Sequence, residues 1–197
     1  MTWCLRRSGL FLFVLAIVHT LWMASIGWGN TLNEPHSFRQ SQTATTAFYM
    51  VGKPFALAYE TPVLGKPWAI PMEFPLYQLI VARIVGLVDS PLDQTGRFVA
   101  LIFFLLTNVP LYRLVRGAGV SANHAWLPLI LFTISPYYVF WSRAFMIEST
   151  ALFFSVAYLA TAIEASLRGR WRWVVLAAVL GAGLPVAAQV PASVRTG

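Results

Sequence analysis

Two short polar segments, each at the end of a long apolar stretch, contain the side chains best suited to chemistry. Residues 33–40 include Glu34, and residues 142–149 include Glu148. A carboxylate at a membrane boundary is costly to desolvate, so it marks a functional site more often than a requirement of the fold. We expect both segments on the same side of a membrane, where they could converge on one reaction.

The first segment combines several polar side chains of different kinds. His36 is titratable, Arg39 is a fixed cation and Gln40 is an amide, all within about two helical turns of Glu34. Such a set suits recognition of a phosphate together with a hydroxyl group. The alternative is that Glu34 merely starts a helix, with Pro35 in its first turn, because carboxylates favour helix N-termini.

Glu148 in the second segment and Glu73 can each be interpreted as a structural or as a functional residue. Glu148 follows Arg143 by five residues, so an ion pair at the membrane surface is the simple interpretation, although the spacing is not the helical i, i+4. Glu73 stands just before an apolar segment and suits either a helix cap or a binding role. Apart from these acids, the chain lacks phosphate-loop, dinucleotide-binding and paired His or Cys ligand motifs.

The composition predicts an all-α integral membrane protein. Hydrophobic residues make up 58% and charged residues 11% of the 197 residues, against roughly half and about a quarter in soluble domains. The net charge of +7 comes from arginines clustered in short loops between apolar stretches, a positive-inside pattern that argues against nucleic-acid binding. The single cysteine, Cys4, excludes an intrachain disulfide.

About five transmembrane helices are expected. They cover residues 10–28, 98–114, 126–141, 150–163 and 173–190. The first is longer than the apolar core of a signal peptide, so it is expected to remain uncleaved. Residues 75–88 form a 14-residue apolar segment of about 21 Å as a helix, too short for a core of about 30 Å. This segment is expected to lie along the interface.

The arginines set the predicted orientation. With a cytoplasmic N-terminus and residues 75–88 not crossing, seven arginines share the cytoplasmic side, as the positive-inside rule requires. They are Arg6, Arg7, Arg113, Arg116, Arg168, Arg170 and Arg172. Six of the seven acids then lie outside: Glu34, Glu60, Glu73, Asp89, Asp93 and Glu148. We therefore expect a multi-pass protein of the cell inner membrane.

One large outer loop is expected between the first two spans. Residues 1–190 are predicted to form a single transmembrane domain, in which residues 29–96 are this loop. The loop should hold a short helix over residues 37–51, stopped by the Gly-Lys-Pro at 52–54, followed by the interfacial helix. Residues 191–197 are expected to be a truncated tail, so the chain is expected to be the N-terminal part of a longer protein.

The order of these features resembles the polytopic glycosyltransferases of the C superfamily, in particular the branch of protein O-mannosyltransferases and the lipid A aminoarabinose transferase. The resemblance covers roughly residues 5–165. Its short motifs are EPHSFRQSQTA at 34–44, EFPLYQ at 73–78 and SRAFMIE at 142–148. The order of these motifs relative to the apolar spans is more specific for the family than any single motif.

The resemblance implies a transferase that takes a sugar from a polyprenyl-phosphate carrier at the outer face of a bacterial inner membrane. Glu34 would be the catalytic carboxylate, and Glu148 would help to bind or orient the acceptor or a divalent cation. The acceptor would be a lipid, a glycan or a protein. Such a transfer needs a base and a cation for the departing phosphate. Arg39, with His36 and Arg143, is the candidate phosphate cradle.

Two other function classes are weighed against the transferase. A transporter or flippase fragment for a lipid-linked sugar should carry polar groups near the middle of the membrane, commonly on broken helices. Here the acids lie at the ends of the spans instead. A non-catalytic membrane assembly protein, or a degenerate remnant, is the other alternative, and the short tail favours it. Loss of sugar transfer when Glu34 is replaced by Gln would distinguish the transferase from both alternatives.

Overall fold

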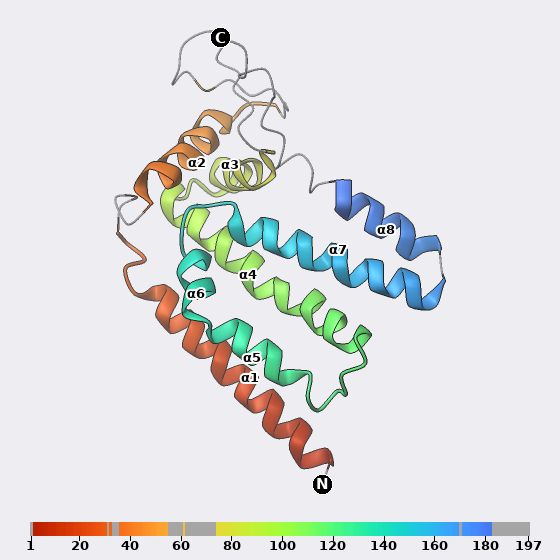
Figure 1. Ribbon diagram of the computed structural model, residues 1–197. Helices are drawn as coiled ribbons and strands as arrows, with labels where there is room; N and C mark the ends of the chain where they lie inside the picture. Colours follow the sequence, from red (N-terminus) through yellow and green to blue (C-terminus); the bar gives the residue numbers. More distant parts are fainter. Residues whose placement is uncertain are drawn as a thin grey trace, which may run out of the picture.

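The structure is a computed structural model that describes residues 2–30, 32, 36–54, 61, 74–169 and 171–182. These residues form helices and no strand, which confirms the predicted all-α class (Figure 1). The helices are α1 (Thr2–Ser25), α2 (Ser37–Met50), α3 (Leu76–Val88), α4 (Leu92–Gly117), α5 (Trp126–Ile134), α6 (Pro136–Ser142), α7 (Glu148–Arg168) and α8 (Trp171–Ala182).

Three helices are long and apolar enough to cross a membrane. They are Ser8–Ser25 within α1, Leu92–Gly117, and Glu148–Leu167 within α7. Large apolar side chains on their outer surfaces are exposed, for example Phe11 at 64% and Trp22 at 63%. Such exposure is unfavourable in water and suits contact with lipid. The protein is therefore a membrane protein, and three of the five predicted spans coincide with these helices.

The predicted span over residues 126–141 is not one helix. It is divided into α5 and α6 at Ser135, whose φ of −58° and ψ of 121° are not helical. The reason is Pro136, because a proline forces the residue before it out of the helical region and itself suits a first helical position. Of the predicted span over 173–190, residues up to Ala182 belong to α8 and the remainder lies outside the described residues.

The long helices lie side by side, and the two outer-loop helices gather at one end of them. α4 contacts α7 and α5, α1 contacts α5, and α8 contacts α7. α2 and α3 contact each other and α4. In Figure 1, α3 is seen nearly end-on while α4 and α7 run across the view, so α3 crosses the direction of the bundle. This placement fits a helix that lies along the interface.

The boundaries of the outer-loop helices agree with those predicted from the sequence. α2 ends at Met50, one residue before the predicted end, and Gly52 has a φ of +74°. Glycine adopts this left-handed conformation without steric cost, so it is well suited to follow a helix end.

A chain of buried polar contacts joins α1, α4 and α5 inside the bundle. The Thr20 hydroxyl donates to the carbonyl of Thr133 at 2.7 Å, and the Thr133 hydroxyl donates to Oδ1 of Asn108 at 3.0 Å. Polar groups between packed membrane helices are commonly paired in this way. The contacts hold α1 against α5 and α5 against α4.

Candidate functional site

The two polar segments meet at the end of the bundle that carries α2. Nε of Arg39 lies 3.3 Å from Oε1 of Glu148. Beside this ion pair, Oε1 of Gln40 accepts a hydrogen bond from the backbone N–H of Phe145 at 3.1 Å. Residues 36–40 of the first segment therefore meet residues 142–149 in the fold, as predicted, whereas residues 33–35 lie outside the described residues.

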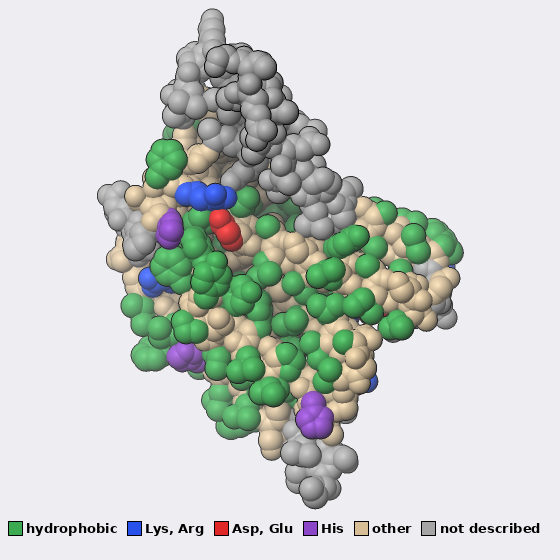
Figure 2. Space-filling model, in the orientation of Figure 1, with side chains coloured by type: hydrophobic (Ala, Val, Ile, Leu, Met, Phe, Trp, Pro, Cys, Tyr) green, Lys and Arg blue, Asp and Glu red, His purple; other side chains and the backbone are tan. Residues whose placement is uncertain are grey.

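Hydrophobic side chains surround these charges. On the face drawn in Figure 2, arginine or lysine and acidic side chains meet near the end that carries α2, and hydrophobic side chains cover much of the remainder. An ion pair at such a boundary is less screened by water than one on a fully solvated surface. The arrangement places opposite charges beside a largely apolar surface.

Glu148 is the first residue of α7, where the helix dipole favours a carboxylate. Its side chain is about one-third exposed, at 34%. Oε1 contacts Arg39, but Oε2 is buried and has no hydrogen-bond partner among the described residues. A buried carboxylate oxygen without a donor is costly. Oε2 of Glu148 therefore has acceptor capacity that the described residues do not use.

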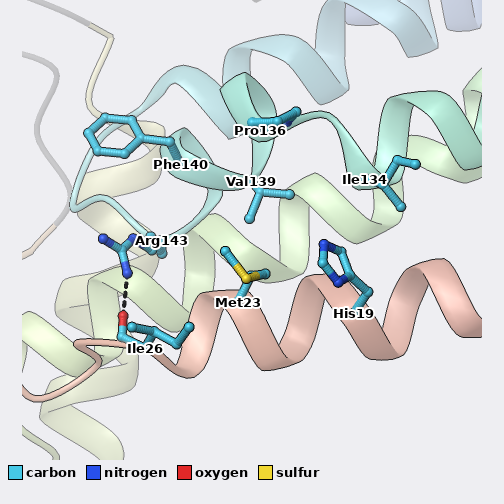
Figure 3. A pocket seen from close by; sticks show the side chains of 8 residues that line it. All are labelled: His19, Met23, Ile26, Ile134, Pro136, Val139, Phe140 and Arg143. Carbon is cyan, nitrogen blue, oxygen red and sulfur yellow. Dashed lines mark hydrogen bonds between the residues drawn. The ribbon is translucent and has the colours of Figure 1, made fainter.

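Arg143 does not pair with Glu148, so that simple interpretation is wrong. Its guanidinium donates instead to the backbone carbonyl of Ile26, directly after the last residue of α1 (Figure 3). A cation is favourable there because the C-terminal carbonyls of a helix carry partial negative charge. Arg143 therefore contacts the end of α1, and Glu148 forms its ion pair with Arg39 of the other segment.

His36 lies on an aromatic surface formed by α6. Its ring centroid is 5.0 Å from that of Trp141 and 6.4 Å from that of Phe140. The backbone of His36 is left-handed, with a φ of 67°, directly before α2 begins. This conformation is uncommon for a residue other than glycine. The ring contacts therefore accompany a sharp turn directly before α2.

Arg97 is a buried cation that the sequence analysis missed. It lies in α4, is 1% exposed, and donates from Nη1 to the carbonyl of Gly27 and from Nη2 to that of Asn30, both at 3.0 Å. It thereby fixes the chain just after α1, from which residues 33–36 continue. A signal was available in the sequence, because Arg97 is an arginine at the predicted outer end of a span, against the positive-inside bias.

Tyr77 connects α3 to the turn that precedes Glu148. Its hydroxyl donates to the carbonyl of Gly96 at 2.8 Å, and its ring meets that of Phe145 edge-on at 5.7 Å. Burial raises the pKa of Tyr77 well above 10.0, the negative charge of Glu148 raises it further, and Arg97 opposes both. The phenol therefore stays neutral and keeps donating its hydrogen bond.

Two predicted site residues, Glu34 and Glu73, lie outside the described residues. The structure describes the other five. Arg39 contacts Glu148, and Gln40 accepts a hydrogen bond from the backbone of Phe145. The ring of His36 contacts a ring of α6, and Arg143 donates to the carbonyl that follows α1. No group of three His, Cys, Asp or Glu side chains that could hold a metal ion occurs in the described part of the chain.

Comparison with protein-family models gives a match over part of the chain. The family model of dolichyl-phosphate-mannose-protein mannosyltransferase matches residues 94–192, about half of the chain, including Arg97, Arg143 and Glu148. No curated protein matches the chain, and no solved structure matches it. The family match confirms the resemblance to the C-superfamily glycosyltransferases. The chain belongs to the dolichyl-phosphate-mannose-protein mannosyltransferase family, a family of membrane glycosyltransferases.

Proposed function

We propose that the protein transfers a sugar from a polyprenyl-phosphate carrier to an acceptor hydroxyl at the outer face of the inner membrane. Family membership supports sugar transfer, and the family description names a dolichyl-phosphate-linked mannose, a donor of this class. The observation that carries the proposal is the 3.3 Å contact between Arg39 and Glu148. It brings a phosphate-binding type of residue and a carboxylate together at the end of the bundle.

The proposed reaction is a displacement at the anomeric carbon of the sugar. The acceptor oxygen forms a bond to that carbon as the bond to the carrier phosphate breaks, and the phosphate leaves with the bonding electrons. Glu34 takes the proton of the acceptor hydroxyl, a role worth about 10²–10⁴-fold in rate. The negative charge that develops on the phosphate needs a nearby cation.

Arg39, His36 and Arg143 are the proposed phosphate ligands. A guanidinium presents its N–H groups in a fixed fork that suits phosphate oxygens. Glu148 holds Arg39 in place through Oε1, while its Oε2 accepts a hydrogen bond from the acceptor. In this proposal Gln40 keeps the Phe145 turn, and hence Glu148, at a fixed position. Glu73 is proposed to contact the acceptor, which is a lipid, a glycan or a protein.

The outer-face location is supported by the distribution of charge. Arg113 and Arg116 lie at the end of α4 away from Glu148, whereas Arg39 and Glu148 lie at the other end. The positive-inside rule assigns the arginine-rich end to the cytoplasm. The pair then faces outward at headgroup depth, where a polyprenyl carrier presents its phosphate.

Replacement of the two acids tests the function. In membranes that contain the full-length protein, Glu34→Gln should lower sugar transfer from a radiolabelled polyprenyl-phosphate sugar by about 10²-fold or more, because the base is lost. Glu148→Gln should also lower transfer at unchanged membrane abundance. Glu164→Gln, an acid near the opposite end of α7, serves as the matched control and should retain activity.

Two outcomes would contradict the assignment. Full transfer by Glu34→Gln would exclude this residue as the base. Chemical tags that reach positions 34 and 148 from opposite sides of the membrane would exclude a shared site. A divalent cation bound through Glu148 is the remaining alternative for that residue, and transfer that persists in a strong chelator would exclude it.

A further inference from the structure

A cavity lies between α4, α7 and α8, toward the end of the bundle opposite the pair of Arg39 and Glu148 (Figure 1). It has a volume of about 280 Å³. α4 lines it with side chains from Leu106 to Arg113, α7 with side chains from Phe153 to Glu164, and α8 with Leu176. Most of this lining is hydrophobic, and its two charged members are Arg113 and Glu164.

Small side chains and a proline account for the space. Pro110 lies inside α4, where a proline removes a backbone hydrogen bond and crowds the preceding turn. Opposite it, Ala157 and Ala160 of α7 are buried but fill little volume. The hydroxyl of Thr161 donates to the carbonyls of Ala157 and Tyr158, so it is satisfied within its own helix. The middle of the cavity is therefore apolar.

The cavity opens on the apolar outer surface of the bundle. Three of its lining side chains are exposed hydrophobic residues, Leu106, Val109 and Leu176. Exposed apolar side chains on membrane helices contact lipid. Acyl chains of the bilayer are therefore available at the opening.

The two charged side chains lie at one level of the bundle. The colours in Figure 1 show that α4 and α7 run in the same direction. Phe103 of α4 and Phe153 of α7 are in ring contact at 5.5 Å. Arg113 follows Phe103 by ten residues and Glu164 follows Phe153 by eleven, so both lie near the far ends of their helices. They line the same cavity there.

These opposite charges are not paired with each other among the described residues. Oε2 of Glu164 is buried and has no hydrogen-bond partner in that part of the chain. Arg113 is exposed, and a guanidinium offers five N–H donors. A buried carboxylate oxygen without a donor is costly, and ionisable groups within membrane spans commonly mark a site. The cavity thus presents an unused acceptor and a cation to a ligand that carries both charges.

The distribution of charge gives the depth of this site. Glu164 is the one acid of the seven that falls on the arginine-rich side, which the positive-inside rule assigns to the cytoplasm. It lies four residues before the end of α7 at Arg168. The charges are therefore at the level of the headgroups of the cytoplasmic leaflet.

We propose that this cavity binds phosphatidylethanolamine, with the ammonium on Glu164 and the phosphate on Arg113. A primary ammonium has three N–H donors for a carboxylate oxygen, and a guanidinium suits a phosphate. Phosphatidylcholine has no N–H donor, and phosphatidylglycerol has no cation. The volume is just below the range of about 300–1,000 Å³ for ligand sites, so the cavity holds the headgroup and the start of one acyl chain.

The proposal goes beyond sugar transfer and does not depend on it. Glu164 follows Glu148 by sixteen residues of α7, about 24 Å along the helix. A measurement of lipid binding at Glu164 and a measurement of sugar transfer therefore report on different sites.

The identity of the headgroup is tested on the parent protein. The full-length protein in detergent micelles is exposed to a phosphatidylethanolamine with a diazirine in one acyl chain near the glycerol, and labelled peptides are identified by mass spectrometry. Labelling is expected on peptides that contain Val109, Phe153 or Leu176. Unlabelled phosphatidylethanolamine should compete about tenfold better than phosphatidylcholine or phosphatidylglycerol with the same chains, since each of these lacks one charge-assisted hydrogen bond.

Charge-neutralising variants test the two assigned contacts. Glu164→Gln keeps the size of the side chain but removes the charge, and it should lower labelling about tenfold and abolish the preference over phosphatidylcholine. Arg113→Gln should also lower labelling. The matched controls are Asp93→Asn, in the first turn of α4, and Arg116→Gln, whose side chain bonds to the carbonyl of Val120 outside the cavity. Both should label as the parent does.

Filling the cavity gives a third test that leaves the charges in place. Val109→Trp introduces an indole at the opening and should remove labelling. Ile102→Trp, at an exposed position of α4 outside the lining, is its matched control and should label normally. Helicity and monodispersity establish that each variant is folded. If a variant does not fold, the headgroup competition on the parent protein decides.

Three results would overturn the proposal. Equal competition by phosphatidylcholine or phosphatidylglycerol would show a surface for phospholipids in general. Labelling confined to other peptides would exclude this cavity. A folded Glu164→Gln protein that keeps its preference for phosphatidylethanolamine would exclude the carboxylate as the ligand of the ammonium.

Discussion

Oε1 of Gln40 accepts a hydrogen bond from the backbone N–H of Phe145 at 3.1 Å, across 105 residues of sequence. Gln40 is 1% exposed and Phe145 is fully buried. The bond therefore ties α2 to the turn before α7 in a place that water does not reach. It places Arg39, the neighbour of Gln40, within reach of Glu148.

Gln40→Leu should destabilise the protein by about 1–3 kcal/mol, because it keeps the size of the side chain but leaves a buried N–H without an acceptor. The measurement is thermal unfolding in detergent, followed by helicity. Gln94→Leu, an exposed glutamine in the first turn of α4, is the matched control and should change stability little. Equal effects of the two substitutions would show that the bond to Phe145 contributes nothing specific.

Gly96→Ala should be destabilising, whereas Gly86→Ala should not. A Cβ at position 96 would lie 2.2 Å from the ring of Phe145, but one at position 86 meets nothing within 4 Å. Both glycines are in helices, so alanine improves helix propensity at both. We expect Gly96→Ala to cost about 1–3 kcal/mol through overpacking and to reduce sugar transfer by moving the turn before Glu148. A stability of Gly96→Ala equal to that of Gly86→Ala would contradict the packing.

Tyr77 should make the protein sensitive to alkali. Its pKa is raised in the folded state by burial and by Glu148, whereas in the unfolded chain it is near 10.0. Below that value the phenol is protonated in both states; above it the unfolded chain releases the proton first. The contribution of Tyr77 to the free energy of unfolding is therefore complete below about pH 10 and is lost as the pH rises further.

Tyr77→Phe removes this dependence. The variant should lose about 1 kcal/mol at pH 8 with its hydrogen bond to Gly96, and the difference from the parent protein should shrink above pH 10. The measurement is chemical unfolding at a series of pH values. Tyr49→Phe, at a partly exposed position, is the control. A constant difference across all pH values would argue that the phenol is not preferentially protonated in the folded protein.

Thr133→Val should loosen the contact between α4 and α5. It removes the hydroxyl that donates to Asn108 and leaves that buried amide oxygen without this donor. Hydrogen bonds of this kind between membrane helices average about 0.6 kcal/mol, with a maximum of about 1.7. Thr107→Val is the matched control, because the bond that its hydroxyl makes among the described residues stays within α4, to the carbonyl of Phe103. Thermal unfolding of the two variants should rank Thr133→Val as the less stable, and the reverse order would contradict the role of the network.

The sequence by itself determined the class of the protein and several of its elements. Apolar length and composition depend on short stretches of chain, so the spans in α1, α4 and α7 and the boundaries of α2 and α3 were predictable. The distribution of arginines also predicted that the two polar segments share one end of the bundle, which the contact between Arg39 and Glu148 confirms. Pro136 could have predicted the break in the span over 126–141. The apolar length of the whole segment, however, favoured a single span.

Only the tertiary structure decided which polar groups meet. Arg143 is nearer to Glu148 in sequence, yet it contacts the end of α1, and Arg39 takes the ion pair because Gln40 fastens α2 to the Phe145 turn. The burial of Arg97 against the carbonyls after α1 likewise follows from the tertiary position of α4 relative to residues 27–30. Hydropathy and spacing describe one segment at a time, whereas these pairings depend on the relative positions of helices far apart in the chain.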